Sequence, residues 1–388
     1  MSLLTAPRIH DGRNWLPENS VVEVADDGTI TAIHDGAVIA QATQYHGILA
    51  PGFVNVHCHL ELSHMKGVVP RHTGLIPFLQ TIPRHRNDYT EEEKSTARAA
   101  AYNELVENGV VAVGDIANVA DTLDVRAKDE LHVHTFVESL GFSATPQKQF
   151  GFSEQVYEAF SKQAGVTKRL RQSIAPHAPY SVSEQLFRMI DEHNKTSLLS
   201  IHNQESNAED EYYMLKMGAV QTLLHSLGID DRFFVPSGKS SLQTYLQWLS
   251  PSHPFIFIHN TCTTRNDVQV AKTLVPETYW CFCPNANLYI ENRLPDVDMF
   301  IAEGATICIG TDSLASNSQL SVLAELHALK HYHSHLDWET LLQWGTYNGA
   351  CALQMQDIAG SLTPGTKPGI LHITNLEDAD SCTIHRII

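Results

Sequence analysis

The chain has 388 residues, enough for two or three domains of about 150 residues or for one large barrel with a small companion. Hydrophobic residues make up 43% of the sequence and charged residues 18%, which excludes a disordered chain. With 26 Lys and Arg against 44 Asp and Glu, the formal net charge is −18. So acidic a protein is poorly suited to bind nucleic acid or an anionic membrane surface.

The sequence carries no signal for export or for membrane insertion. No basic segment followed by an apolar one stands at its start, and no run of about 18 apolar residues occurs. The 7 cysteines are odd in number, and Cys281, Cys283 and Cys308 fall in apolar runs, which favours reduced, buried thiols. We therefore expect a cytoplasmic protein without a membrane or nucleic-acid partner.

Short strand-like runs occupy both ends of the chain. Residues 20–25 and 30–33 flank an Asp-Asp-Gly turn, and residues 369–374 and 381–387 form a similar pair near the other end. We expect residues 1–48 and 356–388 to come together as one small β-sandwich domain, with the rest of the chain inserted between them.

The middle of the chain alternates between strand-like and helix-like segments. Its eight apolar strand-like runs are 48–57, 110–116, 132–137, 170–175, 197–202, 254–259, 279–283 and 306–310. Eight strands that alternate with helices predict an α/β fold of the (β/α)8 TIM-barrel type for residues 49–355.

Metal-ligating residue types stand at the ends of several of these strands. The carboxyl ends of barrel strands converge on one mouth, so His57, His59, His202 and Asp312 are expected to meet there. His57 and His59 are two residues apart on a strand and therefore point the same way. Three imidazoles and a carboxylate suit one divalent ion, most readily Zn²⁺, with Fe²⁺ or Mn²⁺ as alternatives, and leave room for a water molecule.

Two further residues suit acid–base chemistry on that water. Glu205 follows His202 by three residues and is the natural proton acceptor, and His259 could hold the attacking oxygen or polarise the group under attack. Taken singly, Glu205 is a solvated carboxylate at a helix start, and Asp312 is a turn or helix N-cap residue. Their joint placement after strands of one alternating pattern favours a site.

Other metal arrangements fit less well. A two-ion site bridged by a carbamylated lysine needs a lysine at the end of the fourth strand, but Lys168 precedes that strand and His177 stands at its end. The P-C-x-x-C motif of cytidine-type zinc deaminases is absent from the sequence. A single-ion site is therefore favoured.

The sequence resembles the amidohydrolase superfamily, in its cytosine-deaminase and chlorohydrolase-like branch. The resemblance is carried by 51–60 (PGFVNVHCHL), His202 with Glu205, His259, 283–287 (CPNAN) and 310–313 (GTDS). It implies a metal held by His57, His59, His202 and Asp312, with Glu205 as proton shuttle and His259 beside the hydroxide, in agreement with the assignment from the residues alone.

Residues 59–63 (HLELS) and 312–317 (DSLASN) are similar to those of aminodeoxyfutalosine deaminases, which convert a 6-amino purine nucleoside to the 6-oxo form. This resemblance implies substrate contacts from His177, Glu61 and Ser313, and members of the family are often homodimers. We expect hydrolytic deamination of an amino-purine, with aminodeoxyfutalosine as one candidate. Alternatives are hydrolytic dechlorination or cyclic-amide opening of another heterocycle, and a non-catalytic scaffold.

Overall fold

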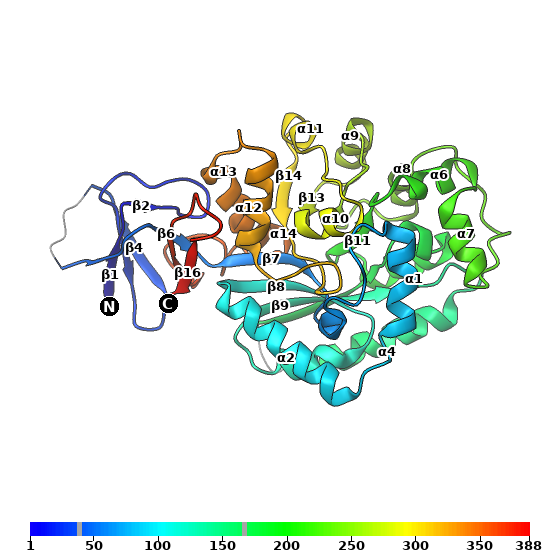
Figure 1. Cartoon of the computed structure of the whole chain (residues 1–388), viewed down its shortest axis with the longest axis horizontal. Coiled ribbons are helices and arrows are strands. Elements are labelled where there is room, and N and C mark those ends of the chain that lie inside the picture. The colour runs from blue at the N-terminus through cyan, green and yellow to red at the C-terminus, as the bar shows by residue number, and fades with distance from the viewer. Residues whose placement is uncertain (37–40, 165–168) are drawn as a thin grey trace.

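The computed structural model describes residues 1–36, 41–164 and 169–388, and within them it consists of a large α/β unit beside a smaller all-β unit. Figure 1 shows both chain termini in the smaller unit at one end of the molecule, with the helices surrounding strands of the larger unit. The α/β class predicted from the sequence is therefore present.

Eight parallel strands form the core of the larger unit, in two four-stranded sheets. The first sheet has the order β10-β9-β8-β7 and the second β11-β12-β13-β14. Their bounds are β7 (Phe53–Cys58), β8 (Val110–Ala117), β9 (His132–Ser139), β10 (Leu170–Pro176), β11 (Leu199–Asn203), β12 (Phe255–His259), β13 (Thr278–Phe282) and β14 (Thr306–Ile309). Every residue of β7 and β8 is buried, as is typical of parallel strands covered on both faces.

The two sheets adjoin at their edges along two seams. Regular strand pairing stops at both seams, so the eight strands form two separate four-stranded sheets and not the continuously paired, closed barrel predicted from the sequence. Side chains bridge the seams instead. Ser173 Oγ donates to the Leu198 carbonyl at 2.7 Å, and Asn55 Nδ2 donates to Thr311 Oγ1 at 2.8 Å. Backbone bonds join the seams at the carboxyl ends of the strands, such as Thr311 N to the His57 carbonyl at 3.0 Å.

Helices follow most of the strands and cover the sheets. They are α1 (Leu75–His85), α2 (Glu91–Glu107), α3 (Leu123–Arg126), α4 (Gln147–Ala164), α5 (Glu184–Asn194), α6 (Asn207–Leu215), α7 (Ala219–Ser226), α8 (Ser241–Tyr245), α9 (Arg265–Leu274), α10 (Pro284–Ile290), α11 (Val297–Ala302), α12 (Val322–Tyr332), α13 (Trp338–Gly345) and α14 (Tyr347–Ala352). Reciprocal capping boxes, Thr90 with Glu93 and Thr264 with Asp267, explain where α2 and α9 begin.

Segments from both ends of the chain build the smaller unit. One sheet has the order β4-β3-β1-β5 and the other β16-β15-β6-β2. Their bounds are β1 (Ser2–Thr5), β2 (Arg8–Ile9), β3 (Val21–Val24), β4 (Ile30–His34), β5 (Thr43–Gln44), β6 (Ile48–Pro51), β15 (Ile370–Thr374) and β16 (Thr383–Arg386). Val22 and Val24 of one sheet share an apolar cluster with Leu49 and Ile370 of the other. Since β6 leads directly into β7, the smaller unit is continuous with the first strand of the larger one.

A separate apolar cluster lies beyond the carboxyl ends of the strands. It joins Met65 of the 3-10 helix η1 (Leu60–Met65) and Phe78 of α1 to Tyr213 of α6 and Ile290 of α10. The polar side chains at the strand ends, such as His57, His202 and Asp312, are themselves buried and so shielded from bulk water.

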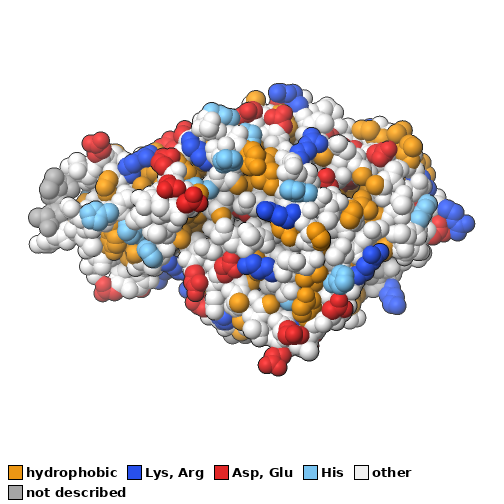
Figure 2. Space-filling view, viewed as in Figure 1, with side chains coloured by type: hydrophobic (Ala, Val, Ile, Leu, Met, Phe, Trp, Pro, Cys, Tyr) orange, Lys and Arg blue, Asp and Glu red, His pale blue; other side chains and the backbone are white. Residues whose placement is uncertain are grey.

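The outer surface carries both signs of charge, and Figure 2 shows acidic and basic side chains intermixed on the face in view. Of the helices within residues 1–36, 41–164 and 169–388, none combines the length and the apolar character needed to cross a membrane.

Candidate metal centre and active site

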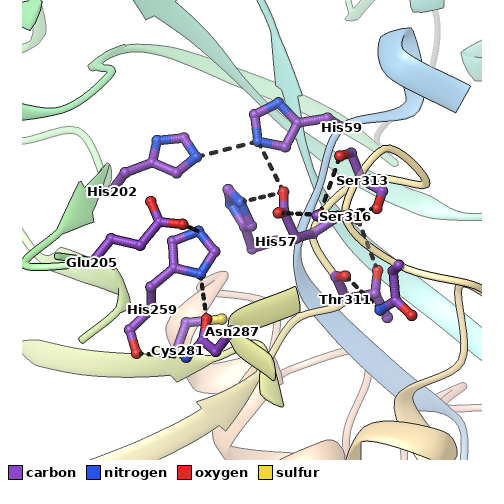
Figure 3. Close-up of polar contacts among 12 residues, drawn as sticks. His57, His59, His202, Glu205, His259, Cys281, Asn287, Thr311, Ser313 and Ser316 are labelled. Atoms are coloured by element: carbon purple, nitrogen blue, oxygen red, sulfur yellow. Dashed lines mark hydrogen bonds and ion pairs between the residues drawn. The ribbon is translucent and has the colours of Figure 1, made fainter. Parts of the chain in front are cut away.

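Four imidazole rings converge where the strands end (Figure 3). His57 belongs to β7, His59 follows it, His202 belongs to β11, and His259 is the last residue of β12. The ring centroid of His57 lies 4.8 Å from that of His59, 4.9 Å from that of His202 and 5.7 Å from that of His259. All four side chains are buried. The structure therefore brings together residues that are far apart in the sequence.

Asp312, just after β14, completes this group. Its Oδ1 lies 3.5 Å from His57 Nε2 and 3.4 Å from His59 Nε2, and His59 Nε2 lies 3.2 Å from His202 Nε2. Single ligand atoms of His57, His59 and His202 lie within 4.8 Å of one another, as do those of His57, His259 and Asp312. The two groups share His57, so the residues predicted as ligands, His57, His59, His202 and Asp312, lie close together around it.

The ring of His57 tests whether a metal ion fits this point. Both of its nitrogens are buried, and neither has a hydrogen-bond partner in the described part of the chain. Buried polar atoms normally have partners, and beyond the ion-pair contact of Nε2 with Asp312 the two nitrogens are left with capacity for a bound ion. Burial lowers the pKa of His57 well below its ordinary range, which leaves the neutral imidazole that metals require. Three imidazoles and one carboxylate are a donor set that fits Zn²⁺ and similar divalent ions.

Three residues at or just after the ends of the strands adopt left-handed backbone conformations. The φ angles are 44° at Gln204, 70° at His259 and 57° at Asp312. Such angles are uncommon outside glycine and persist where the surrounding structure imposes them, often at functional sites. Here they turn the chain sharply at the strand ends that carry the ligands.

Glu205 and His259 lie next to the four predicted ligands. Glu205 is 4% exposed, and its Oε1 lies 3.9 Å from His259 Nε2. His259 Nδ1 lies 2.8 Å from Asn287 Oδ1, so the amide oxygen accepts the Nδ1 proton and leaves Nε2 facing Glu205. Burial raises the pKa of Glu205, and Coulombic interaction with His259 and His202 partly offsets that rise. A carboxyl with a raised pKa suits proton transfer near neutral pH.

Glu138, which the sequence analysis missed, contacts a predicted ligand directly. It lies near the end of β9, and its Oε1 is 3.2 Å from His202 Nδ1. His202 Nδ1 also lies 2.8 Å from the His177 carbonyl oxygen, so both acceptors hold the proton on Nδ1 and leave Nε2 directed at the centre. The available signal was that the third strand, like the others, ends in polar residues.

Ser316 is a second residue that the sequence analysis did not single out. Its Oγ donates to Asp312 Oδ2 at 2.5 Å and thereby fixes the carboxylate (Figure 3). The signal for it in the sequence is weak, because Ser316 lies four residues after Asp312 in a loop whose conformation the residue pattern does not determine.

The three predicted substrate residues differ in their surroundings, and the ligand atoms of His177 form a close group with those of His202 and Glu138. His177 is half-buried, its Nδ1 lies 2.6 Å from Ser181 Oγ, and its ring centroid is 4.9 Å from that of His202. Glu61 accepts from Arg86 NH2 at 3.2 Å, while Ser313 Oγ lies 3.4 Å from Ser316 Oγ. Lys168, weighed as a bridging ligand, is outside the described residues.

Comparison with known proteins assigns the family. The profile of the amidohydrolase family matches residues 48–381, and the chain belongs to that family. It is 26% identical to the adenosine deaminase of Helicobacter pylori over 345 residues, which are 88% of this chain and 82% of the relative. It is 25% identical to the aminodeoxyfutalosine deaminase of a Nitratiruptor species over 302 residues, 76% and 70% of the two chains.

A solved structure shares the fold over almost the whole length. The crystal structure of Helicobacter pylori aminofutalosine deaminase in complex with methylthio-coformycin superposes with a TM-score of 0.80 at 22% identity, covering 95% of this chain and 91% of that one. The resemblance to the amidohydrolases expected from the sequence motifs is therefore confirmed.

Proposed function

We propose that this protein is a metal-dependent hydrolytic deaminase that converts an adenine-type nucleoside and water to the 6-oxo nucleoside and ammonia. The observation that carries the proposal is that the buried Glu205 carboxyl lies next to His259, which itself shares a group of close ligand atoms with His57 and Asp312. The names of the two relatives, an adenosine deaminase and an aminodeoxyfutalosine deaminase, support the reaction class.

The metal would be held by His57, His59, His202 and Asp312, whose ligand atoms lie close together. When bound, a divalent ion such as Zn²⁺ supplies Lewis acidity and lowers the pKa of a water in the site. Among the protein groups, Glu138 keeps the proton of His202 on Nδ1, and Ser316 holds the Asp312 carboxylate.

Glu205 would perform the proton transfers. A carboxylate oxygen of Glu205 takes a proton from the attacking water and delivers it to a ring nitrogen of the purine, because the raised pKa makes the carboxyl both acceptor and donor. His259, with Nδ1 bound to Asn287, would use Nε2 to orient the oxygen that adds to the amino-bearing carbon. Glu205 then passes the remaining proton of the added hydroxyl to the amino group, so the C–N bond breaks, ammonia leaves and the 6-oxo ring remains.

His177, Glu61 and Ser313 are proposed as substrate contacts, as the sequence resemblance implies, and the closeness of the His177 ring to that of His202 supports this. The proposal also includes the finer architecture predicted above, with residues 49–355 as a (β/α)8 barrel and residues 1–48 and 356–388 as a β-sandwich. The apolar cluster shared by the two terminal sheets supports the β-sandwich.

The test is an assay of the purified, zinc-loaded protein. We expect ammonia release from adenosine or a 5′-substituted adenosine, and about one equivalent of bound metal per chain. Chloride release from a chlorinated heterocycle, or carboxylate formation from a cyclic amide, without ammonia release from any adenine nucleoside would contradict the proposal.

A further inference from the structure

Gln204 directly precedes Glu205 and is fully buried. Its φ angle of 44° lies in the left-handed region, which a residue with a side chain seldom adopts unless the contacts around it impose that conformation. The direction in which the chain leaves β11 towards Glu205 depends on this one turn. The contacts that hold Gln204 therefore also decide where the Glu205 carboxyl lies.

Both backbone polar groups of Gln204 bind partners outside β11. Its N–H donates to Glu209 Oε1 of α6 at 3.0 Å, and its carbonyl oxygen accepts the N–H of Cys262 at 2.8 Å. Cys262 belongs to the turn that follows His259, the last residue of β12. The turn that carries Glu205 is thus bonded directly to the turn that follows His259.

The side-chain amide of Gln204 joins two helices that follow different strands. Its Nε2 donates to Asp210 Oδ2 of α6 at 3.0 Å and to Asp267 Oδ2 of α9 at 3.2 Å. An amide nitrogen has two protons, so these two carboxylates use its full donor capacity. Since α6 follows β11 and α9 follows β12, the amide connects the helix after one strand to the helix after the next.

The two carboxylates that bind Gln204 are themselves fixed at helix starts. Asp210 Oδ1 accepts the backbone N–H of Ser241, the first residue of α8, at 2.8 Å. Asp267 Oδ2 accepts the backbone N–H of Thr264 at 3.0 Å within the capping box of α9. The amide of Gln204 is therefore held by acceptors that have little freedom to move.

Asn203 makes further contacts between the same two turns. Its carbonyl oxygen accepts the N–H of Asn260 at 3.1 Å, and its Nδ2 donates to Asn260 Oδ1 at 3.1 Å. Its Oδ1 accepts the hydroxyl of Tyr245 at 2.8 Å. These bonds fix the end of β11, and Gln204 provides the last contacts before Glu205.

We propose that Gln204 is a positioning residue for the deamination: its amide, held between Asp210 and Asp267, sets the turn that keeps the Glu205 carboxyl beside His259 Nε2. Its effect falls on the rate of proton transfer, because its side chain bonds α6 and α9 and the next residue carries the proton. This inference rests on the proposed function, in which Glu205 transfers the protons.

The first test is Gln204→Met, which keeps the length of the side chain and removes both amide donors. With adenosine as the probe, we expect kcat to fall roughly 10- to 100-fold, the cost of a displaced acid–base group, with KM and bound metal per chain unchanged. The matched control is Gln243→Met in α8. Gln243 Nε2 donates to Asp267 Oδ1 at 2.7 Å, so the control also removes an amide donor from Asp267. Among the described residues, the Gln243 side chain bonds no atom of the Glu205 turn, and kcat should stay unchanged.

A second variant exchanges donor and acceptor, which separates positioning from simple loss of stability. Gln204→Glu places another carboxylate against Asp210 and Asp267, and repulsion between like charges should lower kcat at least as much as Gln204→Met. Gln204→Glu combined with Asp210→Asn restores one donor–acceptor pair with the roles reversed. We expect this double variant to recover kcat several-fold over Gln204→Glu.

Amide hydrogen exchange, followed by mass spectrometry on peptides that cover residues 203–210, measures the turn independently of activity. Exchange should be faster in Gln204→Met than in Gln243→Met at equal metal content. Unchanged kcat in folded, metal-loaded Gln204→Met, equal losses of kcat in the two Met variants, or no recovery in the double variant would overturn the inference. Absence of ammonia release from every adenine nucleoside in the wild type would instead refute the deaminase function, whereas the exchange data would still show whether Gln204 holds the turn.

Discussion

At the scale of single residues, the distances around Glu205 fit the proposed division between proton transfer and metal binding. The carboxyl is 3.9 Å from His259 Nε2, and Asp312 rather than Glu205 approaches the imidazoles of His57 and His59. We expect Glu205→Gln to lower kcat by about 10²–10⁴-fold, the usual contribution of a general acid–base group, with bound metal unchanged.

The control for this substitution is Glu211→Gln, which changes an exposed carboxylate of α6 and should leave kcat unchanged. Steady-state ammonia release and elemental analysis on the same samples provide both readouts. Full turnover by a metal-loaded Glu205→Gln protein would show that another group carries the proton.

Glu138 acts at the same scale but through His202. Glu138→Leu removes one acceptor from His202 Nδ1, so the ring is held less firmly with Nε2 toward the centre. We expect metal affinity to fall roughly 10–100-fold, as for other carboxylates that support a ligating histidine, whereas Glu138→Gln, which keeps an acceptor oxygen, should lose less. Competition with a fluorescent chelator measures this, and unchanged affinity in Glu138→Leu would exclude the positioning role.

At the scale of elements, the terminal caps decide where helices begin. Thr90 accepts the Glu93 backbone N–H, and the Glu93 carboxylate accepts the Thr90 N–H at 2.7 Å. Thr90→Ala leaves helix donors of α2 without an acceptor, so the free energy of unfolding should fall by about 1 kcal/mol.

Urea denaturation at fixed metal concentration measures this change. Thr273→Ala, at an exposed position within α9 where the hydroxyl caps no backbone N–H, is the control and should change the free energy of unfolding by less than about 0.5 kcal/mol. Equal effects of the two substitutions would show that the cap of α2 contributes nothing specific.

The way in which the two four-stranded sheets meet is also decided at the scale of elements. Apolar runs predicted all eight strands, because parallel strands buried on both faces are mostly apolar. The first run, 48–57, also covers β6 (Ile48–Pro51), which pairs with β15 in the smaller unit. They could not predict that Ser173 and Asn55 would replace backbone pairing where the two sheets meet, since this depends on how residues of distant strands face each other.

At the scale of the whole molecule, buried neutral histidines connect stability to pH. Burial lowers the pKa of His10 to about 4 and that of His134 to about 3, from an ordinary value of 6.5. Between pH 6.5 and 4 the unfolded chain therefore binds more protons at these residues than the folded chain. The free energy of unfolding should fall as the pH drops through this window, by up to about 1.4 kcal/mol per pH unit for each such histidine.

Denaturant titrations between about pH 7 and pH 5 test this expectation. The slope against pH should be shallower in His10→Gln than in the wild type by up to about 1.4 kcal/mol per pH unit, because one proton is removed from the balance. Identical slopes would mean that His10 binds protons equally in the folded and unfolded chains.

The sequence by itself determined the α/β class, the family and the set of residues that could bind a metal. The candidate metal residues could be predicted because the parallel strands of a barrel place their carboxyl ends at one mouth. Polar residues at those strand ends therefore lie near one another, independently of the loop conformations. For His57, His59, His202 and Asp312 the ligand role remains a prediction, which is supported by the short distances between their side chains.

Only the tertiary structure decided what surrounds that group. The contacts of Glu138 with His202 and of Ser316 with Asp312, and those that hold Gln204 between two helices, depend on side-chain directions across segments that sequence periodicity does not relate. Periodicity reports which face of an element is buried, whereas packing between elements decides which side chain it meets there.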